Sequence, residues 1–285
     1  MLFNMNYTYI DTHAHLNLSA FDEDREDVVL ACLREEVVVI NIGTKLSTSI
    51  KAVEMAEEHE HLYAMIGLHP IQTTPRYHSV EEIGGTPFTS KGEEFDTTVY
   101  RDLSSSPKVV GIGECGFDYF HNGVDTHETQ ETAFLQQIEL ANELQLPLMI
   151  HTRDPKPGAE SPTGRSVYDD VHDILKKHSK VPANIHFYAG NGEQAKKFFE
   201  LGCTISFTGV ITFAKEYEEV VRNAPLDLIH AETDCPYVAP KPHRGQRCNP
   251  TMVKEVYKKI AEIKAMDEED VRVQLVENAR RLYKM

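Results

Sequence analysis

The sequence predicts a single α/β domain, residues 1–285, folded as a (β/α)8 barrel of the TIM type. Eight short apolar runs rich in β-branched residues alternate with helical patterns, and this alternation is typical of a parallel sheet covered by helices on both faces. Eight strands close a barrel, and the length of 285 residues is near the roughly 250 that such a barrel needs. No G-x-G-x-x-G motif follows a strand and no G-x-x-x-x-G-K motif occurs, which argues against an open nucleotide-binding sheet.

The expected elements follow in order along the chain. The predicted strands are 7–10, 37–43, 62–68, 109–114, 146–150, 184–187, 203–207 and 228–232. The run VVVINIG at 37–43 shows the pattern, because it is apolar on both faces and a glycine closes it. Helical patterns are predicted at 23–35, 47–59, 128–145, 250–264 and 268–283, the first of them a charged amphipathic stretch.

Two connections are unusually long, at about 73–106 and 152–164. They follow the third and fifth predicted strands, and they leave the carboxyl ends of those strands, where barrels build their active sites. Two interpretations stay open: tolerated surface insertions, or enlarged loops that wall a substrate cleft.

Composition narrows the class of protein. Apolar residues make up 41% and charged residues 26%, an ordinary mix for a soluble globular chain, and no apolar run approaches the ~18 residues of a membrane-spanning helix. The N-terminus does not read as a signal peptide, and the five cysteines are odd in number and lack a C-x-x-C motif, which favours a reducing cytoplasm. The formal net charge of −16, taken alone, argues against a polyanionic partner.

Polar side chains stand where the predicted strands end. His13 and His15 follow the first strand and point to the same side, because they are two residues apart on an extended segment. The corresponding residues of the fourth, fifth, sixth and eighth strands are Glu114, His151, His186 and Asp234. Strand ends converge on one mouth of a barrel, and imidazoles and carboxylates are ligands of divalent metals. Four histidines and two carboxylates exceed the needs of one tetrahedral ion, which favours two ions bridged by one carboxylate.

Each of these residues also has a structural interpretation. A buried histidine is often a hydrogen-bonded core residue, and an aspartate after a strand often caps a helix. Glu114 is harder to explain in this way, because an unpaired buried carboxylate is costly. The ordered set, at the strand ends of one face, favours the metal site.

Seven motifs in order make the chain resemble a known family. They are IDTHAHL (10–16), IGLHP (66–70), IGECGFDY (112–119), IHTRD (150–154), HF (186–187), ETDCPY (232–237) and ENARRLY (277–283). These segments resemble the TatD family of metal-dependent deoxyribonucleases, within the amidohydrolase-like barrels. The family motif around the sixth strand usually reads HCFTG, whereas this chain has HFYAG at 186–190, so the packing around that ligand is expected to differ.

The resemblance implies a ligand set and an activity. One or two divalent ions, Mg²⁺, Mn²⁺ or Zn²⁺, would be held by His13, His15 and Asp234 on one side and by His151 and His186 on the other, with Glu114 bridging. His69 and Arg153 would lie near the substrate phosphate. The implied activity is hydrolysis of DNA phosphodiesters, chiefly as a 3′–5′ exonuclease on single strands. DNA is therefore the expected partner, and nothing indicates a membrane or an obligatory protein partner.

The chemistry leaves alternatives open. Asp234 is the predicted general base for the attacking water, or else a plain metal ligand. The same ions would polarise a carbonyl, so the alternative function is amide or ester hydrolysis, for example by an aminoacyl-tRNA deacylase. A third hypothesis is a barrel retained as a non-catalytic binding protein.

Two features bear on how DNA would be held by so acidic a chain. The basic run PKPHRGQR at 240–247 is interpreted either as a phosphate-contacting lip or as a solvated loop. Phe117, Tyr119, Phe120 and Tyr237 either stack on bases or pack the rim of the barrel.

Overall fold

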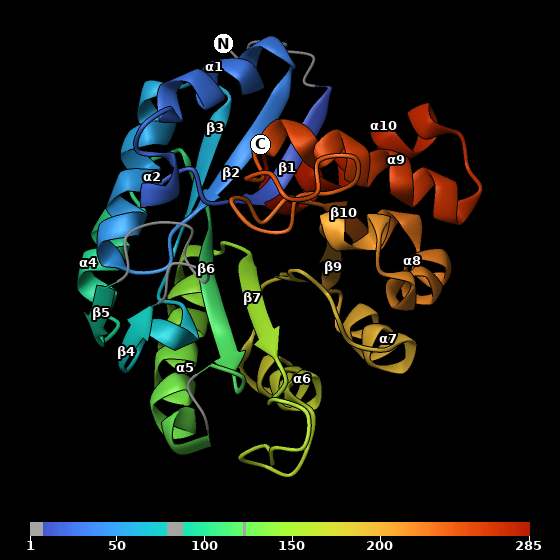
Figure 1. Cartoon of the computed structure of the whole chain (residues 1–285). Coiled ribbons are helices and arrows are strands. Elements are labelled where there is room, and N and C mark those ends of the chain that lie inside the picture. Colours follow the sequence, from blue (N-terminus) through green and yellow to red (C-terminus); the bar gives the residue numbers. More distant parts are fainter. Residues whose placement is uncertain (1–7, 79–87, 122–123) are drawn as a thin grey trace.

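The computed structural model describes residues 8–78, 88–121 and 124–285. An eight-stranded sheet has the order β1-β2-β3-β6-β7-β8-β9-β10, and each neighbouring pair in it is parallel. The strands are β1 (Tyr9–Ala14), β2 (Val37–Ile42), β3 (Leu62–Ile66), β6 (Val109–Asp118), β7 (Leu148–Arg153), β8 (Ala183–Ile185), β9 (Thr204–Phe207) and β10 (Ile229–Ala231). The predicted (β/α)8 barrel is confirmed (Figure 1).

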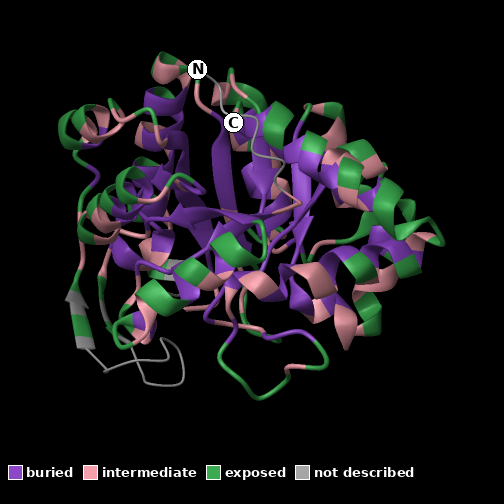
Figure 2. Ribbon diagram, turned by 90° about the horizontal axis from the view of Figure 1, so that it is seen from above, coloured by how far each residue is buried: buried purple, intermediate pink, exposed green. Residues whose placement is uncertain are grey.

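Helices surround this sheet. They are α1 (Arg25–Arg34), α2 (Leu46–Glu58), α4 (Thr97–Leu103), α5 (His127–Leu144), α6 (Val167–His178), α7 (Gly192–Glu200), α8 (Glu218–Asn223), α9 (Val253–Lys264) and α10 (Glu268–Tyr283). Seen from above, the strands are buried and the outer faces of the helices are exposed (Figure 2). Among the described helices, none has the length and apolar character that a bilayer crossing requires.

The barrel closes between β1 and β10 by side chains and loop backbone. The Tyr257 hydroxyl of α9 accepts from the Ile10 amide at 3.2 Å and donates to the Ile10 carbonyl at 3.0 Å. Nearer the carboxyl ends of the strands, the Asp234 amide donates to the His13 carbonyl at 2.9 Å, and the His15 amide donates to the Cys235 carbonyl at 3.0 Å. The last backbone bonds of the ring thus lie at the mouth, between residues predicted to hold a metal.

The long connection at 73–106 carries structure of its own. An antiparallel hairpin, β4 (Pro75–His78) and β5 (Phe88–Lys91), leads into α4. Residues 79–87, within the predicted enlarged loop, lie outside the described residues. The connection at 152–164 begins at the end of β7 and continues to α6, whose N-cap is Ser166.

Candidate metal centre

A cavity of about 600 Å³ opens at the carboxyl ends of the barrel strands. Its lining includes seven residues predicted for the site: His15, His69, Glu114, His151, Arg153, His186 and Asp234. The eighth, His13, is fully buried beneath them. The structure therefore brings the whole predicted set to one place, although the chain separates its first and last members by more than 200 residues.

Glu114 lies at the centre of this set, and its two oxygens face different groups of histidines. Oε1 is 2.6 Å from His186 Nε2 and 2.8 Å from His151 Nδ1. Oε2 is 3.5 Å from His13 Nε2 and 3.9 Å from His15 Nε2. One carboxylate thus joins two imidazole pairs, which is the arrangement a bridging ligand requires.

The first pair is completed by Asp234. Its Oδ1 is 3.4 Å from His15 Nε2 and 3.7 Å from His13 Nε2, and the two Nε2 atoms are 3.1 Å apart. Burial would raise the pKa of Asp234, but the imidazoles of His15, His13 and His186 outweigh it, and the pKa is lowered. Asp234 is therefore a carboxylate at neutral pH, ready to bind a cation.

Proton positions at His15 test whether these residues fit a metal ion. His15 Nδ1 lies 3.0 Å from the carbonyl oxygen of Ile42, which only accepts, so Nδ1 carries the proton. In the neutral ring, Nε2 then presents a lone pair toward the Asp234 carboxylate, and two acceptors face each other. A divalent cation between them removes this conflict, so the donor set fits a metal ion.

In the second pair, His151 and His186, a carboxylate contacts the His151 ring nitrogen that does not face Glu114. Asp118 Oδ2 lies 3.0 Å from His151 Nε2, on the side of the ring opposite Glu114. Asp118 is itself held by the amides of Phe120 and His121 and by the His121 ring at 2.8 Å. Histidines that bind metals commonly donate their other N–H to a carboxylate in this way, which orients the ring.

Burial and neighbouring imidazoles act against each other at Glu114. Burial raises the pKa of this carboxyl, but the imidazoles of His186, His69 and His13 outweigh burial and hold the pKa well below its usual value. Glu114 is thus an anion within a ring of histidines, which makes the centre a cation site despite its depth.

His69 has a different role, because a backbone amide fixes its tautomer. The Ile71 amide donates to His69 Nδ1 at 3.1 Å, so in the neutral ring Nε2 carries the proton and faces Glu114 Oε1 at 3.3 Å. Burial lowers the pKa of His69 to about 4. His69 is therefore a neutral N–H donor on the cavity wall, which suits a contact to a phosphate oxygen better than a bond to a metal.

Three buried carboxylates that support the site were given no role from sequence: Asp11, Asp118 and Glu232. Asp11 accepts from the Thr233 amide at 2.9 Å and from its hydroxyl, and so ties β1 to the segment that carries Asp234. The signal that could have found all three is their even spacing from a ligand, since residues two or four apart on an extended strand share a face.

Only some of the cations and aromatic rings considered for DNA binding line the cavity. Arg153 lines the cavity and lies over the Phe120 ring at 4.7 Å. From the basic run at 240–247, Arg244 lies over Phe213 at 4.0 Å and Arg247 pairs with Asp24; neither lines the cavity. Tyr237 lines the cavity, whereas Phe117 and Tyr119 are buried and pack in the core.

A (β/α)8 barrel with this histidine and carboxylate cluster at its mouth defines the class of metal-dependent hydrolases. Comparison with known proteins agrees. A relative from Bacillus subtilis named "Uncharacterized metal-dependent hydrolase YabD" is 37% identical over 280 residues, covering 96% of this chain and 98% of its own. A second, YcfH of Escherichia coli K12, carries the same description and is 27% identical, covering 96% and 95%.

The particular family follows from a match over nearly the whole chain. Residues 10–284 match the family described as "TatD related DNase", and the chain belongs to this family. Among solved structures, YjjV, a TatD homolog from Escherichia coli K12, superposes with a TM-score of 0.80 at 24% identity, covering 99% of this chain and 100% of that one, which supports the fold.

Proposed function

We propose that this hydrolase cleaves phosphodiester bonds of DNA, as a 3′–5′ exonuclease on single-stranded ends. The observation that carries the proposal is the position of Glu114, whose two oxygens face separate imidazole pairs at the floor of the cavity. Such a centre can hold two cations side by side, as in many enzymes that act on phosphodiesters. The family name supports the same class of substrate.

The residues divide into roles around the bond to be cleaved. His13, His15 and Asp234 would hold one divalent ion, His151 and His186 the other, and Glu114 both. Ions bound there supply Lewis-acid stabilisation of the phosphoryl charge and acidify a water molecule. Asp234 has 13% of its side chain exposed, against 3% for Glu114, so it is the carboxylate placed to accept the proton of the attacking water.

Substrate contacts come from the cavity wall. His69 Nε2–H would donate to a non-bridging phosphate oxygen, and Arg153, at the end of β7, would contact a neighbouring phosphate. A cavity of about 600 Å³ matches a ligand of one or two nucleotides rather than a duplex. This size favours attack at a strand end.

The net charge of −16 limits how DNA is held. Whole-chain charge governs long-range attraction, whereas a cleft with bound cations has its own local field. Lys45 and Arg153 are the lysine and arginine that line the cavity, so few phosphates are contacted. We therefore expect weak binding over a short footprint, with a shallow dependence on salt.

The test is a matrix of metals and substrates on protein stripped of metal and reloaded with Mg²⁺, Mn²⁺ or Zn²⁺. The substrates are single-stranded DNA labelled at either end, blunt duplex DNA, RNA and aminoacylated tRNA. We expect a ladder of shortened products from 5′-labelled single-stranded DNA and early release of a 3′ label. No cleavage of any DNA with any metal would overturn the proposal, and deacylation of charged tRNA in its place would establish the amide or ester alternative.

A further inference from the structure

The inference starts from the second ring nitrogen of each predicted histidine ligand. A neutral histidine that binds a metal through one nitrogen carries its proton on the other, and that N–H needs an acceptor. His15 Nδ1 has the Ile42 carbonyl at 3.0 Å, and His151 Nε2 has Asp118 at 3.0 Å. These two ligands therefore have separate acceptors, one backbone and one side chain.

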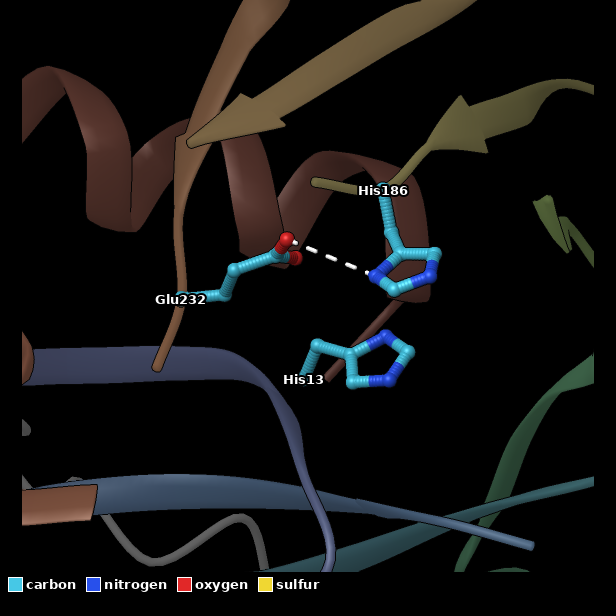
Figure 3. A group of neighbouring side chains, drawn as sticks. All are labelled: His13, His186 and Glu232. Atoms are coloured by element: carbon cyan, nitrogen blue, oxygen red, sulfur yellow. Dashed lines mark ion pairs between the residues drawn. The ribbon is translucent and has the colours of Figure 1, made fainter. Parts of the chain in front are cut away.

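The other two predicted ligands, His13 and His186, lack an acceptor of this kind among the described residues. His13 Nδ1 and His186 Nδ1 are buried and have no hydrogen-bond partner within the described part of the chain, and the same is true of Glu232 Oε2. One ligand atom of each of these three residues lies within 4.8 Å of the other two. Figure 3 shows the Glu232 carboxylate beside the Nδ1 edge of His186, with the His13 ring close by.

The rings of His13 and His186 lie nearly parallel, and each turns one nitrogen toward Glu114. His13 and His186 stack at 3.9 Å between ring centres with 12° between their planes. Their Nε2 atoms face Glu114, at 3.5 Å and 2.6 Å. The Nδ1 atoms are the ring nitrogens that do not face Glu114, and Glu232 is the carboxylate that lies with both residues within 4.8 Å.

Glu232 is held firmly enough to orient both rings. It is fully buried, and its Oε1 accepts from the Phe187 amide at 2.6 Å. Phe187 follows His186 and has φ 43°, a left-handed conformation that is unusual for a bulky residue and persists where surrounding contacts enforce it. His186 Nδ1 is 3.6 Å from the same Oε1, and Oε2 has no partner among the described residues.

We propose that Glu232 is a positioning residue that accepts the Nδ1–H groups of both His13 and His186, and that it thereby couples the two ion positions. The inference rests on the proposed two-ion centre, because His13 belongs to one predicted ligand group and His186 to the other. Glu114 then joins the two groups at the cavity side and Glu232 joins them from beneath. A third cation at Glu232 is disfavoured, since both imidazoles would have to lose a second proton to bind it.

The experiment compares Glu232→Gln with Asp118→Asn, which removes the charge behind His151, the one predicted ligand that Asp118 contacts. Metal-free wild-type and variant proteins are titrated with Zn²⁺ against a chromophoric chelator, and bound metal is counted by elemental analysis. Glutamine keeps an acceptor for the Phe187 amide but offers N–H groups where the second imidazole needs an acceptor. We expect E232Q to weaken both Zn²⁺ binding steps by about 10–100-fold, and D118N to weaken one.

Several outcomes would overturn this role. They are unchanged Zn²⁺ affinities in E232Q, weakening of a single step, or a third Zn²⁺ per wild-type chain that E232Q loses. A single Zn²⁺ per wild-type chain would overturn the coupling together with the two-ion centre. A chain that binds two Zn²⁺ as expected but cleaves no DNA would leave this inference standing while the proposed substrate fails.

A measurement on the wild type covers the case in which E232Q does not fold. Long-range ¹H–¹⁵N spectra of Zn²⁺-loaded protein labelled at histidine report the tautomer of each ring. We expect protonated Nδ1 atoms at His13 and His186, with downfield protons that exchange slowly with solvent. An unprotonated Nδ1 at either ring would overturn the proposal.

Discussion

The two sides of the site are built in different ways. On one side, β6 pairs with β7 up to its last residue, Asp118 opposite Arg153. The register shifts between Ile112 and Cys115, where Glu114 lies, and His151 stands on β7 opposite Gly116. On the other side, β1 meets β10 at a seam joined by the Thr12 hydroxyl, by Asp11 and by two backbone bonds near the mouth. Tyr257 of α9 covers the same edge of β1 through its bonds to Ile10. His13, His15 and Asp234 stand on both edges of that seam.

The difference shows what each side depends on. Strand pairing on either side of Glu114 holds β6 against β7, so the pair of Glu114 and His151 depends mainly on bonds between neighbouring strands. The distance between His13 and Asp234 is set by two backbone bonds and by the Asp11 side chain, which reaches across the seam to Thr233. Substitutions far from the mouth should therefore disturb the seam side more than the ladder side.

The largest effect is expected at Asp234, on the seam side. Asp234→Asn removes the proton acceptor, and kcat on single-stranded DNA should fall by about 10²–10⁴-fold. Bound metal, counted in the same sample, separates loss of the base from loss of a ligand: full metal content with lost turnover supports the base. Asp102→Asn, on the exposed surface of α4, is the matched control and should keep wild-type activity.

Tyr257→Phe tests the seam through stability. The change leaves the buried amide and carbonyl of Ile10 without their hydrogen-bond partner. A buried polar group without a partner costs about 1–3 kcal/mol of stability. Chemical denaturation should show a lower free energy of unfolding by that amount. Tyr63→Phe, on β3, which pairs with both β2 and β6, is the control, and an equal loss there would remove the distinction between seam and ladder.

His230, on β10, should make the free energy of unfolding depend on pH, and it lies on the seam side. Burial lowers its pKa to about 3, with the Arg281 charge as a smaller cause, so the folded protein resists protonation that the unfolded chain accepts near its usual pKa of about 6.5. Stability is therefore lost as the pH falls, by about 2 kcal/mol between pH 7 and pH 5. In metal-free protein, His230→Gln should reduce the acid sensitivity by this amount; equal pH profiles for variant and wild type would contradict the prediction.

The smallest effect is expected at Arg153, on the ladder side. Arg153→Ala removes one phosphate contact, so kcat/KM on single-stranded DNA should fall by about tenfold and the slope of log affinity against log salt should decrease by about 1. Arg244→Ala is the control, because Arg244 lies over Phe213 and donates to the Ala239 carbonyl. A larger salt effect at Arg244 would place the substrate on the 240–247 run instead.

Much of the fold was predictable because buried parallel strands are apolar throughout. The run at 37–43 corresponds to β2 (Val37–Ile42), and the predicted strand at 203–207 to β9 (Thr204–Phe207). Strand ends were less accurate: β6 continues past Glu114 to Asp118, because the residues from Cys115 to Asp118 remain paired with β7. The hairpin of β4 and β5 carried no alternating apolar pattern that could predict it.

The candidate ligands were predictable because they are histidines and carboxylates, and a buried strand end does not need such side chains for packing. Their supporting residues were not, since acceptor and donor are far apart in sequence: 33 residues separate Asp118 from His151, and 222 separate Asp11 from Thr233. The 240–247 run looked basic in sequence, but the structure turns Arg247 to Asp24. Side-chain direction, which decides such cases, is set by tertiary contacts.

The Tyr257 contact has a consequence for how the chain is made. Ile10 is synthesised 247 residues before its hydroxyl partner, so the outer edge of β1 lacks this contact while the intervening chain is made. An unpaired strand edge is open to association with other chains during that interval. The Tyr257 contact forms only when α9 has been made, and an ion that binds the closed ring of strands but not the open chain shifts the balance toward completed molecules.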